Sequence, residues 1–335
     1  MKRSSMMCLF VLLLVYCSSV HGAPTALWVF GDSLVDNGNN NFINSIAKSN
    51  YFPYGIDFNN RLPTGRFSNG KTFVDILGEL LGMSSPPPFA DPSTRGGRIL
   101  GGVNYASAAA GILDETGQHY MDRFPLSQQV INFESTLSEL RTMMSPGDLN
   151  THLSKSIAVM VFGSNDYINN YLMPSIYTSS INYNPQQFAN LLLNHYARQL
   201  VALYSVGLRK FLLAGIGPLG CIPNQLATGQ APPGRCVDYV NQILGSFNEG
   251  LRSLVTLMNN GFNVWDRACC GVGRNQGQIT CLPYQFPCLD RSKYIFWDAF
   301  HPTQAVDAIL AQRAYSGPPS DCYPINVQQM AAINF

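Results

Sequence analysis

The sequence predicts an α/β fold in which a mostly parallel sheet is covered by helices on both faces. Short apolar runs recur along the chain, and longer amphipathic segments lie between most of them. Buried parallel strands are typically continuous apolar runs, and helical crossovers connect them. We see no internal repeat, charge block or interdomain linker, so residues 23–335 are expected to form a single domain.

Residues 1–22 have the pattern of a secretory signal peptide. Lys2 and Arg3 precede an apolar stretch over residues 8–15, and small residues suited to cleavage follow. We expect cleavage after Gly22; an uncleaved anchor is the alternative. No later segment reaches about 18 uninterrupted apolar residues, so no integral membrane segment is expected after the signal is removed. The protein is therefore expected to be secreted and to be extracellular or in the cell wall.

The first half of the mature chain supplies two strands and two helices. The apolar run over residues 26–33 predicts a buried strand, and the Asn- and Gly-rich segment behind it opens a long loop. Gly82 ends the first amphipathic segment, and Pro146 follows the second. The expected elements are a strand over 26–33, a loop over 36–71, a helix over 72–81, a strand over 103–106 and a helix over 126–143.

The second half continues the alternation. Asn184 is a good helix cap, Pro185 suits a first turn and Gly207 ends the clearest helix of the chain. Long loops inside a compact domain are more often functional than ordinary connections, so the loops over 36–71 and 267–297 are both expected to be functional. The expected elements are strands over 156–162, 210–215 and 262–266, helices over 184–207, 236–260 and 303–315, and a loop over 267–297.

Charge and cysteine content restrict the partners and the compartment. Removal of Lys2 and Arg3 leaves 19 basic against 20 acidic residues with no basic stripe, so a nucleic-acid partner is not expected. Seven cysteines remain, all in the C-terminal third, and an oxidising compartment would allow them to pair. Because seven is odd, at least one cysteine stays free or pairs between chains. The cysteines are Cys221, Cys236, Cys269, Cys270, Cys281, Cys288 and Cys322.

The spacing of these cysteines leaves their connectivity open. Cys221 and Cys236 would close a local loop, and either Cys269 or Cys270 could reach Cys281 or Cys288. No C-x-x-C pair occurs and no histidine lies in the cluster, so no metal site is expected there.

Ser33 is the candidate nucleophile. It follows the apolar run that predicts the first strand, and ligand sites of open parallel sheets lie at the carboxyl ends of the strands. A neutral serine needs a base within hydrogen-bond reach and a third group that orients the base. The G-x-S-x-G elbow, H-E-x-x-H and Walker motifs are absent from the chain.

His301 and Asp298 are the candidate base and orienting acid. Pro302 suits the first turn of a helix, so His301 lies on a tight connection just before it. A carboxylate three residues earlier can reach the imidazole Nδ1, which would fix the tautomer of the ring. The alternative is that Asp298 caps the helix and His301 is a surface residue. Of the other histidines, His195 lies on the apolar face of the helix that Asn184 caps, where we expect a core residue.

Asn165 is the candidate side-chain donor of an oxyanion hole. It follows the strand expected over 156–162, which ends at the same sheet edge as Ser33. The alternative is an ordinary Asn-Asp turn. A backbone N–H within residues 104–111 and the N–H of Ser33 could supply further donors.

Three blocks of the sequence together resemble the signature of a known family. Residues 31–34 (GDSL), 163–166 (GSND) and 298–301 (DAFH) resemble successive blocks of the GDSL (SGNH-hydrolase) esterase/lipase family, in its large secreted plant branch. The resemblance runs from about residue 26 to 316. It implies a three-layer, flavodoxin-like α/β/α fold and hydrolysis of carboxylic esters.

The resemblance also implies roles for individual residues. By this resemblance, Ser33 would be the nucleophile, His301 the base, Asp298 the orienting acid and Asn165 an oxyanion donor. Where the family usually places an oxyanion glycine, the register suggests Ala109, with Gly111 two residues on. A backbone N–H donates equally well from alanine, so either residue could supply the donor.

The expected activity is hydrolysis through an acyl-enzyme on Ser33, without a cofactor or metal. An acyltransferase with the same catalytic residues and an alcohol acceptor is one alternative, and a non-catalytic extracellular binding protein is another. The expected partner is a small or polymer-linked ester. The sequence leaves open the acyl group, the alcohol and the oligomeric state.

Overall fold

The computed structural model describes residues 24–247, 264–318, 321–322 and 325–333. The expected signal peptide and its cleavage site lie outside the described residues. So does most of the helix expected over residues 236–260, of which the structure describes α8 (Asp238–Ile243).

Three parallel strands form the central sheet, in the order β1-β2-β3. They are β1 (Leu27–Gly31), β2 (Ile157–Val161) and β3 (Lys210–Ala214), and each pair runs in register over its whole length. On the other edge of β1, the segment expected as a strand over 103–106 forms only isolated parallel bridges, from Asn104 to Val29 and from Asn104 to Pro88. The Tyr105 N–H nevertheless donates to the Val29 carbonyl at 2.7 Å, so the segment extends the sheet by hydrogen bonding.

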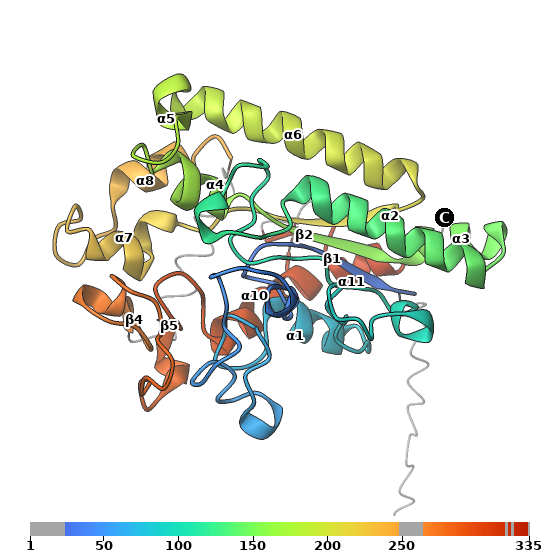
Figure 1. The fold of residues 1–335 in the computed structure, drawn as a ribbon, viewed down its shortest axis with the longest axis horizontal. Coiled ribbons are helices and arrows are strands. Elements are labelled where there is room, and N and C mark those ends of the chain that lie inside the picture. Colours follow the sequence, from blue (N-terminus) through green and yellow to red (C-terminus); the bar gives the residue numbers. More distant parts are fainter. Residues whose placement is uncertain (1–23, 248–263, 319–320, 323–324, 334–335) are drawn as a thin grey trace, which may run out of the picture.

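The side chains of β1 alternate between two separate hydrophobic clusters, one on each face of the sheet. Trp28 and Phe30 pack with residues of α2 (Leu126–Met143), α3 (Pro146–Lys155) and α6 (Pro185–Ser205). Leu27 and Val29 pack with residues of α1 (Phe73–Leu80), α10 (Gln304–Ser316) and α11 (Val327–Ala331). Figure 1 shows these two groups of helices on opposite sides of the strands. The expected three-layer α/β/α architecture is confirmed.

The longest helix begins and ends where the sequence indicates. The Asn184 side chain accepts from the Gln187 N–H and the Gln187 side chain accepts from the Asn184 N–H, which together make a capping box ahead of α6. Gly207, at φ +121°, takes the chain out of the helix in a conformation that favours glycine.

The C-terminal third contains a strand that the sequence analysis missed. β4 (Val264–Ala268) pairs in parallel with β5 (Tyr294–Phe296), which lies within the region expected as a loop over 267–297. A run of three residues is too short to be distinguished from loop by periodicity.

Several short helices were also not expected. For α3, Pro146 was interpreted as the end of the preceding helix, whereas it is the first residue of a new one capped by Ser145. A further helical segment, Tyr167–Tyr171, has π-type hydrogen bonding. The others are α4 (Ser164–Asp166), α5 (Ser179–Asn182), α7 (Pro223–Ala227) and α11.

The structure resolves the cysteine connectivity that the sequence left open. Three disulfides join Cys221 to Cys236, Cys269 to Cys288 and Cys270 to Cys281. Cys322 is a free thiol. The odd cysteine expected from the count is therefore the last one. In the described part of the chain, none of the helices has the length and hydropathy of a membrane span.

Candidate active site

Ser33 lies on a tight turn directly after β1. The Asp32 side chain accepts from the Leu34 N–H at 3.0 Å, and the Asp32 carbonyl accepts from the N–H groups of Val35 and Asp36. Gly31 makes the close packing of this turn feasible, since a Cβ there would lie 2.4 Å from Val35 Cγ2. The turn places the half-buried Ser33 side chain at the carboxyl end of the strand.

His301 and Asp298 meet Ser33 at this edge of the sheet. His301 Nε2 lies 2.5 Å from Ser33 Oγ, and His301 Nδ1 lies 2.8 and 2.9 Å from the two carboxylate oxygens of Asp298. Asp298 Oδ1 also accepts from the N–H groups of Phe300 and His301, both at 2.9 Å. The three-residue spacing therefore works as an Asx-type turn that folds the carboxylate onto the imidazole.

Tyr54 is a member of this network that the sequence analysis missed. Its hydroxyl donates to Asp298 Oδ2 at 2.6 Å and lies 3.2 Å from Thr280 Oγ1. The tyrosine is fully buried and packs against Trp297, and the Phe67 ring lies 4.8 Å from the His301 ring between centroids. A concentration of aromatic residues at 51–54, within an otherwise polar loop, was the available signal that this part of the loop is buried.

The surroundings of Asp298 favour its ionised form. Burial opposes the carboxylate, but the neighbouring His301 and the hydrogen bonds from His301, Tyr54 and Phe300 together hold the pKa of Asp298 below its ordinary value. Asp298 is therefore a carboxylate at neutral pH, which is the state needed to orient and stabilise an imidazolium.

Asn165 is held with its amide nitrogen available. Gly163, at φ +112°, turns the chain from β2 into α4, where Asn165 lies. The Asn169 amide donates to Asn165 Oδ1 at 2.6 Å, and Asn165 Nδ2 donates to the Ala110 carbonyl at 2.9 Å. Asn169 was not expected from the sequence; it fixes which end of the Asn165 amide is the donor and leaves one Nδ2 hydrogen for a ligand.

Ala109 is notable for its backbone conformation, and Gly111 for the lack of space around its Cα. Ala109 is buried in the left-handed region at φ +66°, a conformation that favours glycine. A Cβ on Gly111 would lie 2.4 Å from Thr116 Cγ2 and 2.6 Å from Asp166 Oδ1, so packing alone explains that glycine. Within the described residues, the N–H groups of Ser33, Ala109 and Gly111 donate to no protein acceptor.

Two buried carboxyl groups lie on the turn that carries Ser33, and a third is close enough to interact with the first of them. Burial raises the pKa of Asp32 to about 7, and one of its oxygens has no hydrogen-bond partner among the described residues. Burial also raises the pKa of Asp36 and of Asp166 to about 6, although each accepts at least two backbone N–H groups. The protein therefore holds protons on these groups at pH values where an unfolded chain has released them.

We expect the free energy of unfolding to fall as the pH rises from about 5 to about 8. The raised pKa of Asp32 stabilises the folded protein by a few kcal/mol at most. This stabilisation is complete below the unfolded pKa of about 4 and is lost as the pH rises through about 7. The lowered pKa of Asp298 acts only below this window. Burial lowers the pKa of His119 and of His152, which opposes part of the fall at pH values below about 6.5. Thermal unfolding at a series of pH values measures how steeply the stability falls with pH. The Asp32→Asn variant should show a shallower fall.

The exposed Asp148→Asn is the matched control and should leave the slope unchanged. A melting temperature that increases between pH 5 and pH 8 would contradict this assignment, as would equal slopes for Asp32→Asn and the unaltered protein.

The remaining described histidines lie elsewhere. His119 Nδ1 contacts the Tyr177 hydroxyl at 2.8 Å, and the His152 ring packs edge-on to Trp28. His195 is only half-buried on α6, so the expectation of a core histidine there was wrong. Across the described residues, no group of three His, Cys, Asp or Glu side chains is arranged to hold a metal ion.

Comparisons with known proteins all point to one protein family. A protein-family model described as GDSL-like Lipase/Acylhydrolase matches residues 27–314. GDSL esterase/lipase At1g71250 of Arabidopsis thaliana is 60% identical over 92% of this chain and 89% of its own length. GDSL esterase/lipase At5g08460 of the same plant is 52% identical over 92% of this chain and 88% of its own length. GDSL esterase/lipase 7, also of Arabidopsis thaliana, is 45% identical over 99% of this chain and 100% of its own length.

Proposed function

The chain belongs to the GDSL-like lipase/acylhydrolase family and is a hydrolase of ester bonds, and we propose that it acts through an acyl-enzyme on Ser33. The observation that carries this proposal is the 2.5 Å contact between Ser33 Oγ and His301 Nε2. The two residues come from opposite ends of the described chain and meet with the Asp298 carboxylate on the far side of the ring.

In the first half of the reaction, His301 Nε2 accepts the proton of Ser33 Oγ as the oxygen attacks the ester carbonyl carbon. The carbonyl π bond opens and its electron pair becomes the oxyanion of a tetrahedral intermediate. We assign the free Nδ2 hydrogen of Asn165 and the N–H groups of Ser33 and Ala109 as its donors. Asp298 accepts from Nδ1 and stabilises the imidazolium.

In the second half, the protonated His301 donates its proton to the alcohol oxygen as the bond to the carbonyl carbon breaks. Water then attacks the acyl-Ser33 ester while His301 accepts its proton, and collapse of the second intermediate releases the acid and regenerates Ser33. Each proton is taken and returned at the same nitrogen, so the reaction needs only these residues and water.

We further propose that residues 23–335 act as a single secreted domain. The three disulfides fit an oxidising compartment, since such bonds persist outside the cytosol. The match of one family model to residues 27–314 supports a single unit.

An activated alkyl phosphonate tests the proposal directly. We expect a p-nitrophenyl alkylphosphonate to form a bond from Ser33 Oγ to phosphorus and to release p-nitrophenol, with the adduct located by peptide mass spectrometry. His301→Ala should slow labelling by roughly 10³-fold, because the serine loses its base. His119→Ala, which removes a histidine outside the site, should label at the normal rate. Labelling at another serine, or labelling that does not depend on His301, would refute the mechanism.

A further inference from the structure

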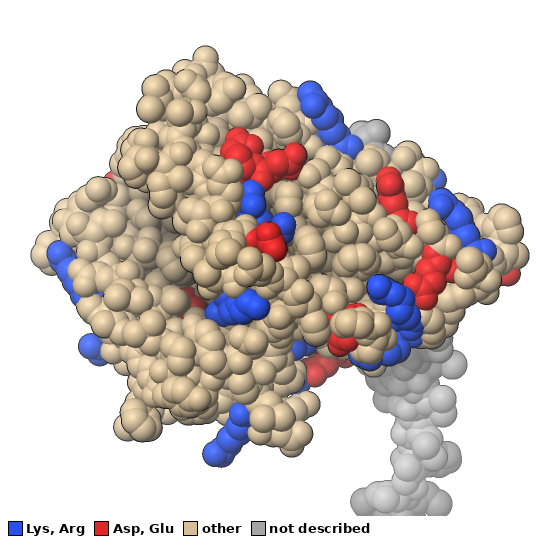
Figure 2. Space-filling view, in the orientation of Figure 1, with Lys and Arg blue, Asp and Glu red and all other residues tan. Residues whose placement is uncertain are grey.

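A segment of large apolar side chains lies exposed beside the active site. The exposed fractions are 81% for Tyr284, 91% for Phe286 and 98% for Leu289, and Ile279 and Leu282 are also exposed. Residues 279–289 form a loop that turns at residues 282–285, and we call this loop the apolar hairpin. No charged residue occurs between Arg274 and Asp290, and Figure 2 shows the surface over β4 and β5 as mostly uncharged. Exposed apolar residues grouped in this way typically mark a binding surface.

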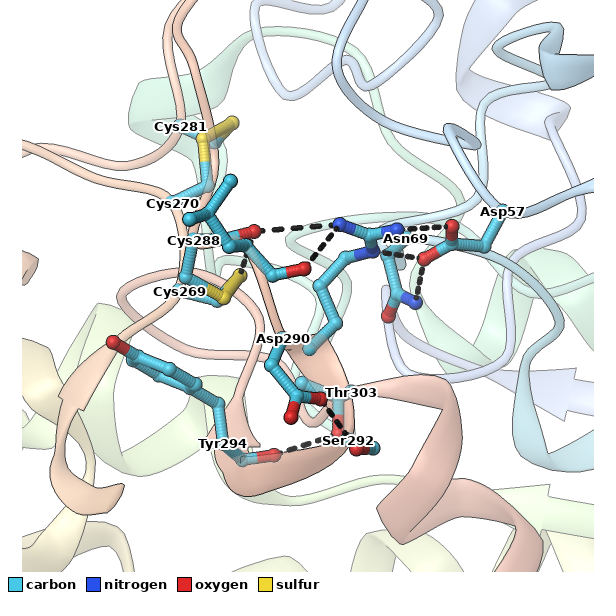
Figure 3. The surroundings of a disulfide bond; sticks show 12 residues. Asp57, Asn69, Cys269, Cys270, Cys281, Cys288, Asp290, Ser292, Tyr294 and Thr303 are labelled. Atoms are coloured by element: carbon cyan, nitrogen blue, oxygen red, sulfur yellow. Dashed lines mark hydrogen bonds and ion pairs between the residues drawn. A yellow bond between two sulfur atoms is a disulfide. The ribbon is translucent and has the colours of Figure 1, made fainter. Parts of the chain in front are cut away.

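The apolar hairpin is held firmly at both ends. Disulfides join Cys270 to Cys281 and Cys269 to Cys288, and Figure 3 shows the two pairs side by side. Arg291 donates to the Cys288 carbonyl and forms an ion pair with Asp57, which continues the support at the C-terminal end.

The tip of the apolar hairpin is also fixed. The Leu282 N–H donates to the Gln285 side chain at 3.0 Å, and the Tyr284 N–H donates to the Phe52 carbonyl at 2.7 Å. Tyr284 lies at φ +62°, a conformation that is rare for a bulky residue. Such strain persists only where the surroundings impose it and is often associated with function. The exposed rings are therefore presented by an ordered backbone.

The apolar hairpin is continuous with the residues that support Asp298. The Tyr51 hydroxyl donates to the Cys281 carbonyl at 2.9 Å, and the Tyr54 hydroxyl lies between Thr280 and Asp298. The Cys270 N–H donates to the Trp297 carbonyl at 2.7 Å. A surface that binds the apolar hairpin would thus lie close to the catalytic residues.

We propose that the apolar hairpin inserts into the apolar phase of an aggregated, water-insoluble ester and holds the enzyme at a lipid–water interface. The inference rests on the proposed function, because the interface would carry the substrate. An uncharged set of Tyr, Phe and Leu suits the boundary between acyl chains and water and requires no anionic lipid. Eleven residues on a projecting loop are fewer than the about 20–30 a side of a stable protein interface, which favours a lipid surface over a second copy of the chain.

The double variant Phe286→Ser, Leu289→Ser separates interface binding from chemistry. With phosphatidylcholine vesicles that contain a long-chain p-nitrophenyl ester, we expect sedimentation with the vesicles and hydrolysis to fall at least tenfold. Hydrolysis of dissolved p-nitrophenyl acetate should stay within twofold. Ile181→Ser is the matched control, because Ile181 is 71% exposed on α5, and it should change neither result.

A second variant keeps the inference testable if the double variant does not fold. Phe286→Trp should retain vesicle binding and show a blue shift of its fluorescence on vesicles. The inference is overturned if the unaltered protein does not bind vesicles, if the double variant hydrolyses both substrates normally, or if light scattering shows a dimer that the double variant dissociates. Failure of the unaltered protein to hydrolyse p-nitrophenyl acetate would instead refute the proposed function, since vesicle binding is measured separately.

Discussion

Replacing Ser33 with alanine is expected to lower kcat/KM for ester hydrolysis by roughly 10⁵- to 10⁶-fold. The variant loses the oxygen that forms the acyl-enzyme, and His301 then has no hydroxyl at 2.5 Å from which to accept a proton. What activity remains would come from water activated by the same imidazole and from the oxyanion donors. Initial rates with a soluble p-nitrophenyl ester measure the loss.

Ser135→Ala is the matched control, because Ser135 is exposed on α2 and its hydroxyl contacts only the preceding turn of that helix. It should retain full activity. If Ser33→Ala keeps activity within a few-fold of the unaltered protein, another residue is the nucleophile and the assignment of Ser33 is wrong.

Replacing Asp298 with asparagine is expected to lower kcat by roughly 10⁴-fold. In the protein, both carboxylate oxygens accept hydrogen bonds: from His301 Nδ1, from Tyr54 and from two backbone N–H groups. The asparagine amide has only one oxygen that can accept from these donors. Its NH₂ group, itself a donor, faces the donors that the second carboxylate oxygen had accepted from. The imidazole is then favoured as the tautomer that carries its proton on Nε2, which cannot accept from Ser33. The pH dependence of kcat for the soluble ester measures the effect.

Tyr54→Phe gives a graded comparison with Asp298→Asn. It removes one donor to Asp298 but leaves the carboxylate and its contacts with His301, so we expect a loss of only about tenfold. Because that donor helps to lower the pKa of Asp298, its removal should shift the acid limb of the kcat profile to higher pH. A positioning role is contradicted if Tyr54→Phe keeps the normal acid limb, or if it is as inactive as Asp298→Asn with an unchanged melting temperature.

Much of the fold was predictable because local patterns specify it. The apolar runs at β1, β2 and β3 identified the strands of the central sheet, and the caps at Asn184 and Gly207 bounded α6. Misses occurred where the local signal was weak. β5 has only three residues, and α3 begins at a proline that also suits the end of the preceding helix.

The residues of the candidate site also fall into two groups, those that a short sequence pattern predicts and those that it does not. Ser33, Asn165 and the pair Asp298 and His301 each stand in a recognisable short pattern, and the structure brings them to one edge of the sheet. Tyr54 and Asn169 have no such pattern, because what identifies them is a single hydrogen bond to a group that the chain places beside them by folding.

By itself, the sequence determined the alternation of strands and helices, the identity of the candidate catalytic groups and the fact that at least one cysteine is left over. These depend on side-chain chemistry and on spacings of a few residues, which a linear chain displays directly. Only the tertiary structure decided which cysteines pair, that Tyr54 supports Asp298 across 244 positions of sequence, and that the apolar hairpin stands exposed beside them. Those facts follow from the packing of distant segments, where the environment of a side chain is set by neighbours that its own stretch of sequence does not contain.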